Sequence, residues 1–183
     1  MNDVSKRVVT LDGTTLNTLD VHDVAHEFAI VQVAEEAMLK VALSRKVVDR
    51  IVDGDETVYG INTGFGSLVH TRVDQDEAEQ LQLNLIRSHA TGLGPTLSKE
   101  VVRAMMCVRL NSLVKGHSGV HPDVIQQLSQ FLNNSIHPIV PRIGSLGASG
   151  DLAPLSHLAC ALVGEGRVEL GGEIMTAMEA IRT

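Results

Sequence analysis

Residues 144–157 read GSLGASGDLAPLSH, and the rest of the chain is best understood outward from this stretch. Three glycines fall within its first seven positions, and a backbone without Cβ atoms can approach itself or a ligand closely. The residues after Asp151 turn apolar, which predicts a buried helix over 152–162. Pro154 fits the first turn of that helix, and Asp151 fits its positive end.

Three interpretations of this loop are open. The simplest is a glycine-rich turn that enters a helix. A phosphate-binding loop is disfavoured, because the stretch has neither the Lys-Ser/Thr ending of a P-loop nor the G-x-G-x-x-G spacing of a dinucleotide-binding loop. The third is chemical: the amide nitrogen of Gly150 can attack the carbonyl carbon of Ala148 if the loop is held tightly. Loss of two water molecules, one from the ring and one from the Ser149 side chain, would leave a five-membered ring with an electrophilic exocyclic methylene.

The segment ASGDLAPL, residues 148–155, resembles the signature of the aromatic amino acid ammonia-lyase family, whose members carry this ring as a methylidene-imidazolone (MIO) prosthetic group. The resemblance implies that the MIO group forms autocatalytically from Ala148-Ser149-Gly150, with Asp151 and Leu152 in support and no soluble cofactor. It also implies the N-terminal part of the ammonia-lyase fold, which is mainly α with short strands or hairpins and glycine-rich active-site loops.

The composition is that of one mainly helical domain over residues 1–183. Apolar residues make up 44% of the chain, but it holds one Tyr, three Phe and no Trp, so its core must be aliphatic, which favours helix packing. The net charge of -7 argues against the basic face that nucleic-acid binding requires. No apolar run is long enough to span a membrane and no signal-peptide core follows the N-terminus, so we expect a cytoplasmic protein without membrane contact.

Hydrophobic periodicity and cap signals outline the elements along the chain. A short strand or hairpin is predicted within 1–19, Pro138 and Pro141 predict extended chain, and Gly171-Gly172 predicts a two-residue hairpin turn. Helical patterns begin at Asp20 and recur over 34–53 with Gly54 as its C-terminal cap, 74–92 with a capping box at Asp74, 98–116, 122–134 and 177–182.

Two pairs of side chains could in principle bind a metal, and both are predicted to be structural. Cys107 and Cys160 lie far apart in apolar helical runs and are expected to be buried thiols rather than a disulfide or a metal pair. His22 and His26 share a helix face, but no third ligand or H-E-x-x-H pattern accompanies them. We therefore expect a solvated helix face there and no metal site.

A second glycine-rich stretch, VYGINTGFG at 58–66, holds the only phenol of the chain, Tyr59. Three glycines in seven residues disfavour both helix and regular strand, so a shaped loop is predicted. A tyrosine in such a loop is commonly a half-buried amphipathic residue. The stretch also resembles the family's Tyr-Gly-(Ile/Val)-Asn-Thr-Gly-Phe-Gly loop. That resemblance implies that Tyr59 is the general base in a mobile lid, supported by Gly60, Asn62, Thr63, Gly64, Phe65 and Gly66.

The segment LNLIRSHATG, residues 83–92, ends the predicted third helix. In related enzymes the positions matching Ser88 and His89 line the pocket for the substrate side chain. This pair resembles the histidine-specific members, whereas tyrosine-selective relatives have His-Leu and phenylalanine-selective ones Phe-Leu. An imidazole substrate needs polar partners, because a buried donor or acceptor left unpaired costs about 1–3 kcal/mol. Taken alone, His89 also fits a structural histidine near a helix end.

The resemblance implies elimination of ammonia from L-histidine to give trans-urocanate, the first step of histidine degradation. The electrophile would act on the substrate amino group while Tyr59 removes the β-proton, so that one difficult step becomes two easier ones. One alternative is a relative that acts on phenylalanine or tyrosine, or an aminomutase. Leu146 and Ser156 favour it, because histidine-specific members often have Val and Ala there. The other is an inactive fragment or interaction module whose tripeptide never cyclises.

The resemblance extends from about residue 8 to residue 183, which is only the N-terminal third of a typical family member. The central helical bundle, with further catalytic and carboxylate-binding residues, is therefore expected outside these residues. Family members are homotetramers whose active sites draw on three subunits. We expect the chain to be a fragment of a longer lyase or a truncated gene product, with a small amino acid as the substrate of the whole enzyme.

Overall fold

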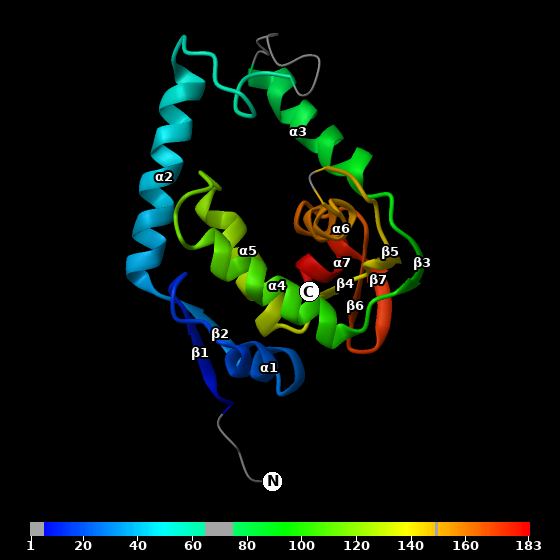
Figure 1. Ribbon diagram of the computed structural model, residues 1–183. Helices are drawn as coiled ribbons and strands as arrows, with labels where there is room; N and C mark the ends of the chain where they lie inside the picture. The colour runs from blue at the N-terminus through cyan, green and yellow to red at the C-terminus, as the bar shows by residue number, and fades with distance from the viewer. Residues whose placement is uncertain (1–5, 65–74, 149) are drawn as a thin grey trace.

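The computed structural model describes residues 6–64, 75–148 and 150–183. Within these ranges the chain is mainly α-helical, as the sequence predicts, and its short strands form two pairs and one triplet (Figure 1). The helices are α1 (Thr18–His26), α2 (Glu35–Asp53), α3 (Gln75–His89), α4 (Lys99–Leu113), α5 (Pro122–Asn133), α6 (Ala153–Leu162) and α7 (Ala177–Arg182). The strands are β1 (Val8–Leu11), β2 (Ile30–Val33), β3 (Leu93–Thr96), β4 (His137–Pro138), β5 (Pro141–Ile143), β6 (Arg167–Leu170) and β7 (Glu173–Thr176).

The N-terminal unit is a two-stranded parallel sheet whose strands are connected through α1. β1 pairs with β2 so that Val8 lies opposite Ile30. Asn17 caps α1 with its side chain, and Asp20 completes a capping box. The sequence predicts β1 but not β2, because four residues between two helical patterns carry too short a periodicity to be recognised.

α4 and α5 cross the centre of the molecule and carry much of its core (Figure 1). The aliphatic core that the composition predicts is confirmed, and Phe131 is the aromatic exception on these two helices. Cys107 and Cys160 are both free and buried, as predicted. Burial raises the pKa of the Cys107 thiol to about 11. The completely buried aliphatic residues of the two helices are Met106, Leu110, Ile125 and Leu128.

Two small antiparallel sheets flank the helices. In the three-stranded sheet β6 lies between β4 and β7. The β6–β7 hairpin turns at Gly171 and Gly172, whose φ angles of +63° and +91° suit glycine, and this confirms the predicted turn. β3 pairs with β5, with Leu93 opposite Ile143, and so joins the chain that leaves α3 to the chain that enters the loop at Gly144.

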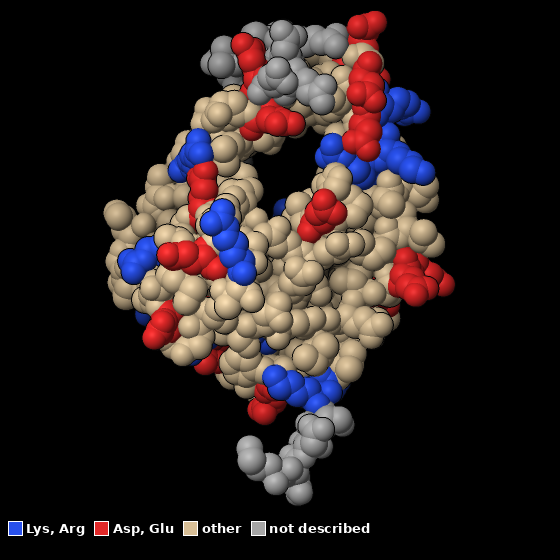
Figure 2. Space-filling view, turned by 180° about the vertical axis from the view of Figure 1, so that it is seen from behind, with Lys and Arg blue, Asp and Glu red and all other residues tan. Residues whose placement is uncertain are grey.

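α2 and α3 extend away from this body on opposite sides (Figure 1). The space-filling view shows an opening between them (Figure 2). A cavity of about 500 Å³ lies there, lined by α2, by α3 and by residues from three connecting segments. These segments contribute Gly60, Ile61, Ser118, Gly119 and Val163.

Several predicted helix ends differ in detail from the structure. α1 begins at Thr18 rather than at Asp20, and α4 ends at Leu113 rather than at Gly116. α3 ends at His89 rather than at Gly92, because the Gly92 N–H donates to the imidazole of His157 instead of a helical carbonyl. Gly54 follows α2 as predicted, but its backbone is extended, with φ -97° and ψ -177°, and does not adopt the left-handed form common at helix ends. The predicted cap at Asp74 lies outside the described residues.

One buried polar network fastens α4 to its neighbours. The completely buried Arg103 donates to the backbone oxygens of Val24 at 2.8 Å and Leu132 at 2.9 Å, which lie in the last turns of α1 and α5. Arg103 also lies 3.4 Å from Nε2 of His137, whose Nδ1 lies 3.3 Å from a carboxylate oxygen of Glu169. A guanidinium only donates, so Nε2 accepts and His137 is neutral with its proton on Nδ1.

Candidate active site

The loop after β5 reverses direction within a few residues. The Gly150 N–H donates to the carbonyl oxygen of Gly147 at 3.0 Å, and the two glycines form an isolated antiparallel bridge. Gly150 has φ +83°, a conformation that residues with a Cβ rarely adopt. Ala148 is exposed, and Ser149 lies outside the described residues.

Regular structure holds both ends of this loop. β5 leads into it while paired with β3, and α6 begins at Ala153 directly after it. Asp151 accepts from the Ala153 N–H at 3.2 Å and so lies at the positive end of α6, as predicted. Leu152 precedes the helix and is partly exposed. The loop therefore lies between an extended segment and an apolar helix, as the sequence predicts.

The segment after α2 is a compact loop built around the buried side chain of Asn62. Its Oδ1 accepts from the Val58 N–H at 2.8 Å, and its Nδ2 donates to the Glu56 carbonyl at 2.7 Å. The hydroxyl of Thr63, also buried, accepts from the Gly60 N–H at 3.3 Å. The side chains of Asn62 and Thr63 thus make hydrogen bonds with backbone groups of this loop that a helix or strand would otherwise supply.

Tyr59 projects from this loop with 62% of its surface exposed. Gly60, with φ +77°, turns the chain directly after it. Gly64 is buried, whereas Phe65 and Gly66, the last two residues of the predicted lid, lie outside the described residues. The loop therefore presents a phenol that a ligand can reach.

His89 ends α3, and the last turn of that helix orients its ring. Nδ1 lies 2.8 Å from the carbonyl oxygen of Leu85, which can only accept, so Nδ1 carries a proton, and Nε2 is the acceptor in the neutral ring. Ser88 donates to the same carbonyl at 2.9 Å, and its oxygen lies 3.1 Å from Nδ1. His89 is half-buried and presents an acceptor nitrogen, which suits a donor such as an imidazole N–H.

Two polar contacts join the end of α3 to α6 and to the turn that follows α6. The Gly92 N–H donates to Nε2 of His157 at 3.0 Å, and burial lowers the pKa of His157, which favours the neutral acceptor form. Arg87 holds both carboxylate oxygens of Glu165, with Nε and Oε2 2.9 Å apart. This pairing raises the pKa of Arg87 and lowers that of Glu165. Both contacts hold the 88–89 pair beside the helix that follows the loop at 144–151.

The three predicted segments are not equally close to one another. The end of α3 shares the neighbours β3 and α6 with the loop at 144–151, whereas the Tyr59 loop lies toward the other end of α3 (Figure 1). There Gln82 Nε2 donates to the Gly60 carbonyl at 3.5 Å. The cavity between α2 and α3 is lined by Gly60 and also by Ile86 and Val163, and its size falls in the range of small-molecule pockets.

The family of the chain follows from a match over most of its length. Residues 16–183 match the model of the family described as aromatic amino acid lyase. The chain belongs to this family. It is 50% identical over 175 residues to histidine ammonia-lyase from Bacillus subtilis (strain 168), and 50% identical over 172 residues to that from Staphylococcus aureus (strain JH9). These alignments cover 96% and 94% of this chain but 34% of each relative, so the chain spans about a third of their length.

Solved structures of aromatic amino acid lyases and related enzymes share the fold. Tyrosine aminomutase from Streptomyces globisporus is 41% identical with a TM-score of 0.87, over 95% of this chain and 32% of that one. Histidine ammonia-lyase from Trypanosoma cruzi is 37% identical with a TM-score of 0.87, over 96% and 34%. Ergothionase from Treponema denticola is 33% identical with a TM-score of 0.90, over 96% and 35%. The fold described above is thus the N-terminal third of this lyase fold.

The contacts between α3 and α6 in this lyase chain are features that the sequence analysis does not find. His157 and Gly92 are 65 residues apart, and Arg87 and Glu165 are 78 apart, so no local pattern links them. One signal was available for His157, since it lies on the same helix as the end of the signature segment, two residues after Leu155. A histidine at this position can contact the segment that packs on the first turns of α6, which in this structure includes Gly92.

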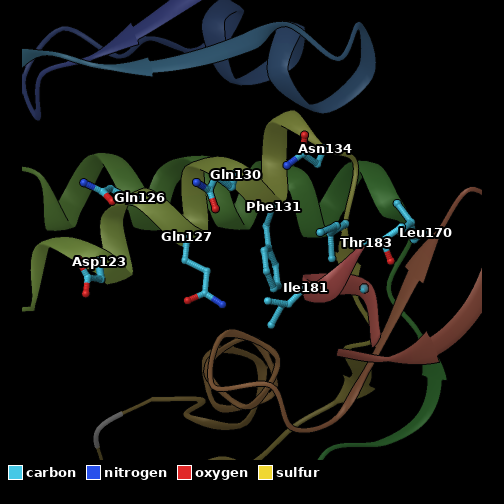
Figure 3. A pocket seen from close by; sticks show the side chains of 11 residues that line it. Asp123, Gln126, Gln127, Gln130, Phe131, Asn134, Leu170, Ile181 and Thr183 are labelled. Atoms are coloured by element: carbon cyan, nitrogen blue, oxygen red, sulfur yellow. The ribbon is translucent and has the colours of Figure 1, made fainter. Parts of the chain in front are cut away.

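A separate groove of about 590 Å³ lies between α5 and α7 (Figure 3). Its walls are mainly amide and apolar side chains, and the carboxylate of Asp123 lies at one end. None of the predicted lyase residues lines it. Because the groove contains none of those residues, it is not the candidate active site. The amides belong to Gln126, Gln127, Gln130 and Asn134.

His22 and His26 are exposed and stack with ring centroids 4.7 Å apart. Among the described residues, no group of three or more His, Cys, Asp or Glu side chains is arranged to hold a metal ion. Nor does the described part of the chain contain a helix with both the length and the apolar character that crossing a bilayer demands.

Proposed function

We propose that this chain forms the electrophile-bearing part of a histidine ammonia-lyase, which eliminates ammonia from L-histidine without oxidation to give trans-urocanate. The 50% identity to two histidine ammonia-lyases across nearly the whole chain carries this proposal. The tightly reversed loop around Ala148-Ser149-Gly150 and the acceptor nitrogen of His89 support it.

The residues present fit the formation of the MIO group. A hydrogen bond between Gly147 and Gly150 already brings the ends of the loop together, and a Cβ built on either glycine would meet nothing within 4 Å. For cyclisation, the Gly150 nitrogen forms a bond to the Ala148 carbonyl carbon, and that carbonyl oxygen leaves as water with the amide protons of Gly150 and Ser149, which leaves a double bond between that carbon and the Ser149 nitrogen. The Ser149 hydroxyl then leaves with its Cα proton as a second water. The reaction needs no oxidant and no external cofactor.

Other residues of this chain would have separate roles in the elimination of ammonia. The MIO group supplies an electrophile for the substrate's amino group and so makes that nitrogen a better leaving group. Tyr59, exposed on its loop, takes the β-proton as general base. The buried Asn62 and Thr63 fix the backbone on which Tyr59 stands. Residues outside this chain would bind the substrate carboxylate and complete the site.

His89 would select the substrate in this proposal. Its Nδ1 proton is already engaged by the Leu85 carbonyl, so Nε2 can accept a hydrogen bond from the N–H of a substrate imidazole. A phenyl ring has no such donor and would cover this acceptor without pairing it, at a cost of about 1–3 kcal/mol. Ser88 holds the same carbonyl and keeps the ring in place.

A second candidate function stays within the family and changes the substrate. The chain is 41% identical to a tyrosine aminomutase, against 37% for the histidine ammonia-lyase of Trypanosoma cruzi. Leu146 and Ser156 favour this candidate, because histidine-specific members often have Val and Ala at these positions. A tyrosine-specific or phenylalanine-specific lyase, or an aminomutase, would use the same tripeptide and the same base.

We further propose that the whole enzyme is a cytoplasmic homotetramer. The resemblance to the family supports this assembly, as does the exposed apolar surface of α2. Leu39, Leu43 and Val47 lie one helical turn apart on that surface and are 66%, 62% and 47% exposed. An apolar stripe of this kind normally packs against another element.

A chimeric enzyme tests the function. In the chimera, this chain replaces the matching third of the Bacillus subtilis histidine ammonia-lyase. The chimera is given histidine, tyrosine or phenylalanine, and the absorbance of the product, urocanate, coumarate or cinnamate, is followed. We expect histidine to be converted fastest. Faster conversion of tyrosine or phenylalanine would favour the second candidate. A folded tetrameric chimera that converts none of the three would overturn the assignment.

A further inference from the structure

We infer that Gly144 and Asp151 form a clasp that closes the base of the loop, and that Gly144 is thereby a positioning residue for cyclisation of the tripeptide at 148–150. This inference rests on the proposed function, because it concerns how the MIO group forms. The clasp consists of Gly144, Ser145, Asp151 and Ala153, two residues from each end of the loop.

The carboxylate of Asp151 joins the two ends of the loop. Its Oδ1 accepts from the Ser145 N–H at 2.8 Å, on the side that arrives from β5, and from the Ala153 N–H at 3.2 Å, on the side that enters α6. The Ser145 hydroxyl adds a weaker bond at 3.3 Å. Hydrogen bonds to an ionised carboxylate are about twice as strong as neutral ones.

The close fit at Gly144 permits this arrangement. A Cβ built on Gly144 would overlap both carboxylate oxygens of Asp151 as well as its Cγ. Any larger residue at 144 therefore pushes the carboxylate away from the Ser145 N–H. In contrast, a Cβ on Gly147, three residues further along the same loop, would meet nothing within 4 Å.

The clasp confines the segment that must react. It leaves only residues 146–150 between its two sides, and the bond from Gly150 to Gly147 shortens the free chain further. Ring formation requires the Gly150 nitrogen to stay close to the Ala148 carbonyl, and holding reacting atoms together can contribute most of the acceleration of such a step. The clasp thus supplies the tightness that the tripeptide chemistry requires.

The test compares the mass of the tryptic peptide that follows Arg142 in the wild-type chain and in four variants. We expect the wild type to lack two water molecules. Gly144→Ala should lower the fraction with this deficit about tenfold or more, since a misplacement of about 1 Å can cost up to a hundredfold in rate. The matched control Gly147→Ala adds the same methyl group in open space and should keep the deficit.

Two further variants separate positioning from chemistry at Asp151. Asp151→Asn keeps an oxygen that can accept from Ser145 and Ala153 and should retain much of the deficit, whereas Asp151→Ala should lose it. Residues 142–148 are exposed, so Gly144→Ala and Gly147→Ala should unfold at the wild-type temperature, and a thermal melt of all four variants checks that each is folded.

Each outcome decides the matter. A full deficit in Gly144→Ala, beside a full deficit in the wild type, would overturn the clasp and leave the proposed function standing. Equal loss in Gly147→Ala and Gly144→Ala, or complete loss in Asp151→Asn, would also overturn it. A wild-type chain with no deficit would overturn the clasp and the proposed chemistry together.

Discussion

Tyr59 and His89 are held in different ways, and the difference follows from their neighbours. Tyr59 is exposed on a loop whose backbone is fixed by the buried Asn62, while His89 is oriented by a carbonyl of its own helix. The first arrangement exposes the Tyr59 side chain at the surface of the loop. The second fixes which ring nitrogen carries the proton.

Replacement of Tyr59 by Phe tests its role as base. In the chimeric enzyme we expect histidine turnover to fall by about 10²–10⁴-fold, the usual contribution of general acid–base catalysis. The two-water deficit of the tripeptide should stay, because the phenol has no part in its formation. Turnover within a factor of two of the parent chimera would remove Tyr59 from the mechanism.

Replacement of His89 by Leu tests substrate selection. The acceptor nitrogen is lost, so kcat/KM for histidine should fall about tenfold or more, as expected for an unpaired polar group worth about 1–3 kcal/mol. The values for tyrosine and phenylalanine should change less. Equal losses for all three amino acids would make His89 a structural residue.

At the scale of elements, the sequence predicts the long helices from their periodicity and the hairpin from Gly171-Gly172, because these signals lie within the elements themselves. It does not predict β2 or β3, which are four-residue strands defined by partners elsewhere in the chain. In the candidate site, too, local motifs can be predicted from the sequence and long-range contacts cannot. The motifs around Tyr59 and Ser149 are visible in the sequence, whereas the contact between Gly92 and His157 depends on how α3 packs on α6.

Packing of α3 on α6 should govern the alignment of the site. A Cβ at Gly92 would lie 3.0 Å from His157 Nε2 and 3.0 Å from Pro141 Cβ, so in Gly92→Ala these neighbours must shift by a few tenths of an ångström, which disturbs the contact between the end of α3 and His157. We expect kcat/KM for histidine in the chimera to fall about tenfold or more, since small displacements of positioning groups are costly. The tripeptide should still lose two waters. Unchanged kinetics would show that this contact does not align the site.

At the scale of the whole molecule, the network of Arg103, His137 and Glu169 connects α1, α4, α5 and the three-stranded sheet. Burial, and then the neighbouring Arg103, lowers the pKa of His137, and the carboxylate of Glu169 opposes this only in part. Lys99 lies 3.1 Å from the same carboxylate. The folded chain therefore holds His137 neutral to lower pH than the unfolded chain does.

Stability should accordingly depend on pH through His137. Its contribution is complete above the unfolded pKa of about 6.5 and is lost as the pH falls toward the lower folded pKa, by at most about 1.4 kcal/mol per pH unit. We expect denaturant midpoints between pH 7.5 and 5 to fall more steeply for the wild type than for His137→Gln. The exposed His121→Gln serves as control, and parallel curves for wild type and His137→Gln would contradict the expectation.

Conversion of Ala148-Ser149-Gly150 into an electrophile can be read from the mass of the wild-type peptide from Ile143 onward. We expect a peptide lighter than its sequence by two water molecules, with the loss localised by fragmentation to residues 148–150. A peptide with the full mass of its sequence would contradict this expectation.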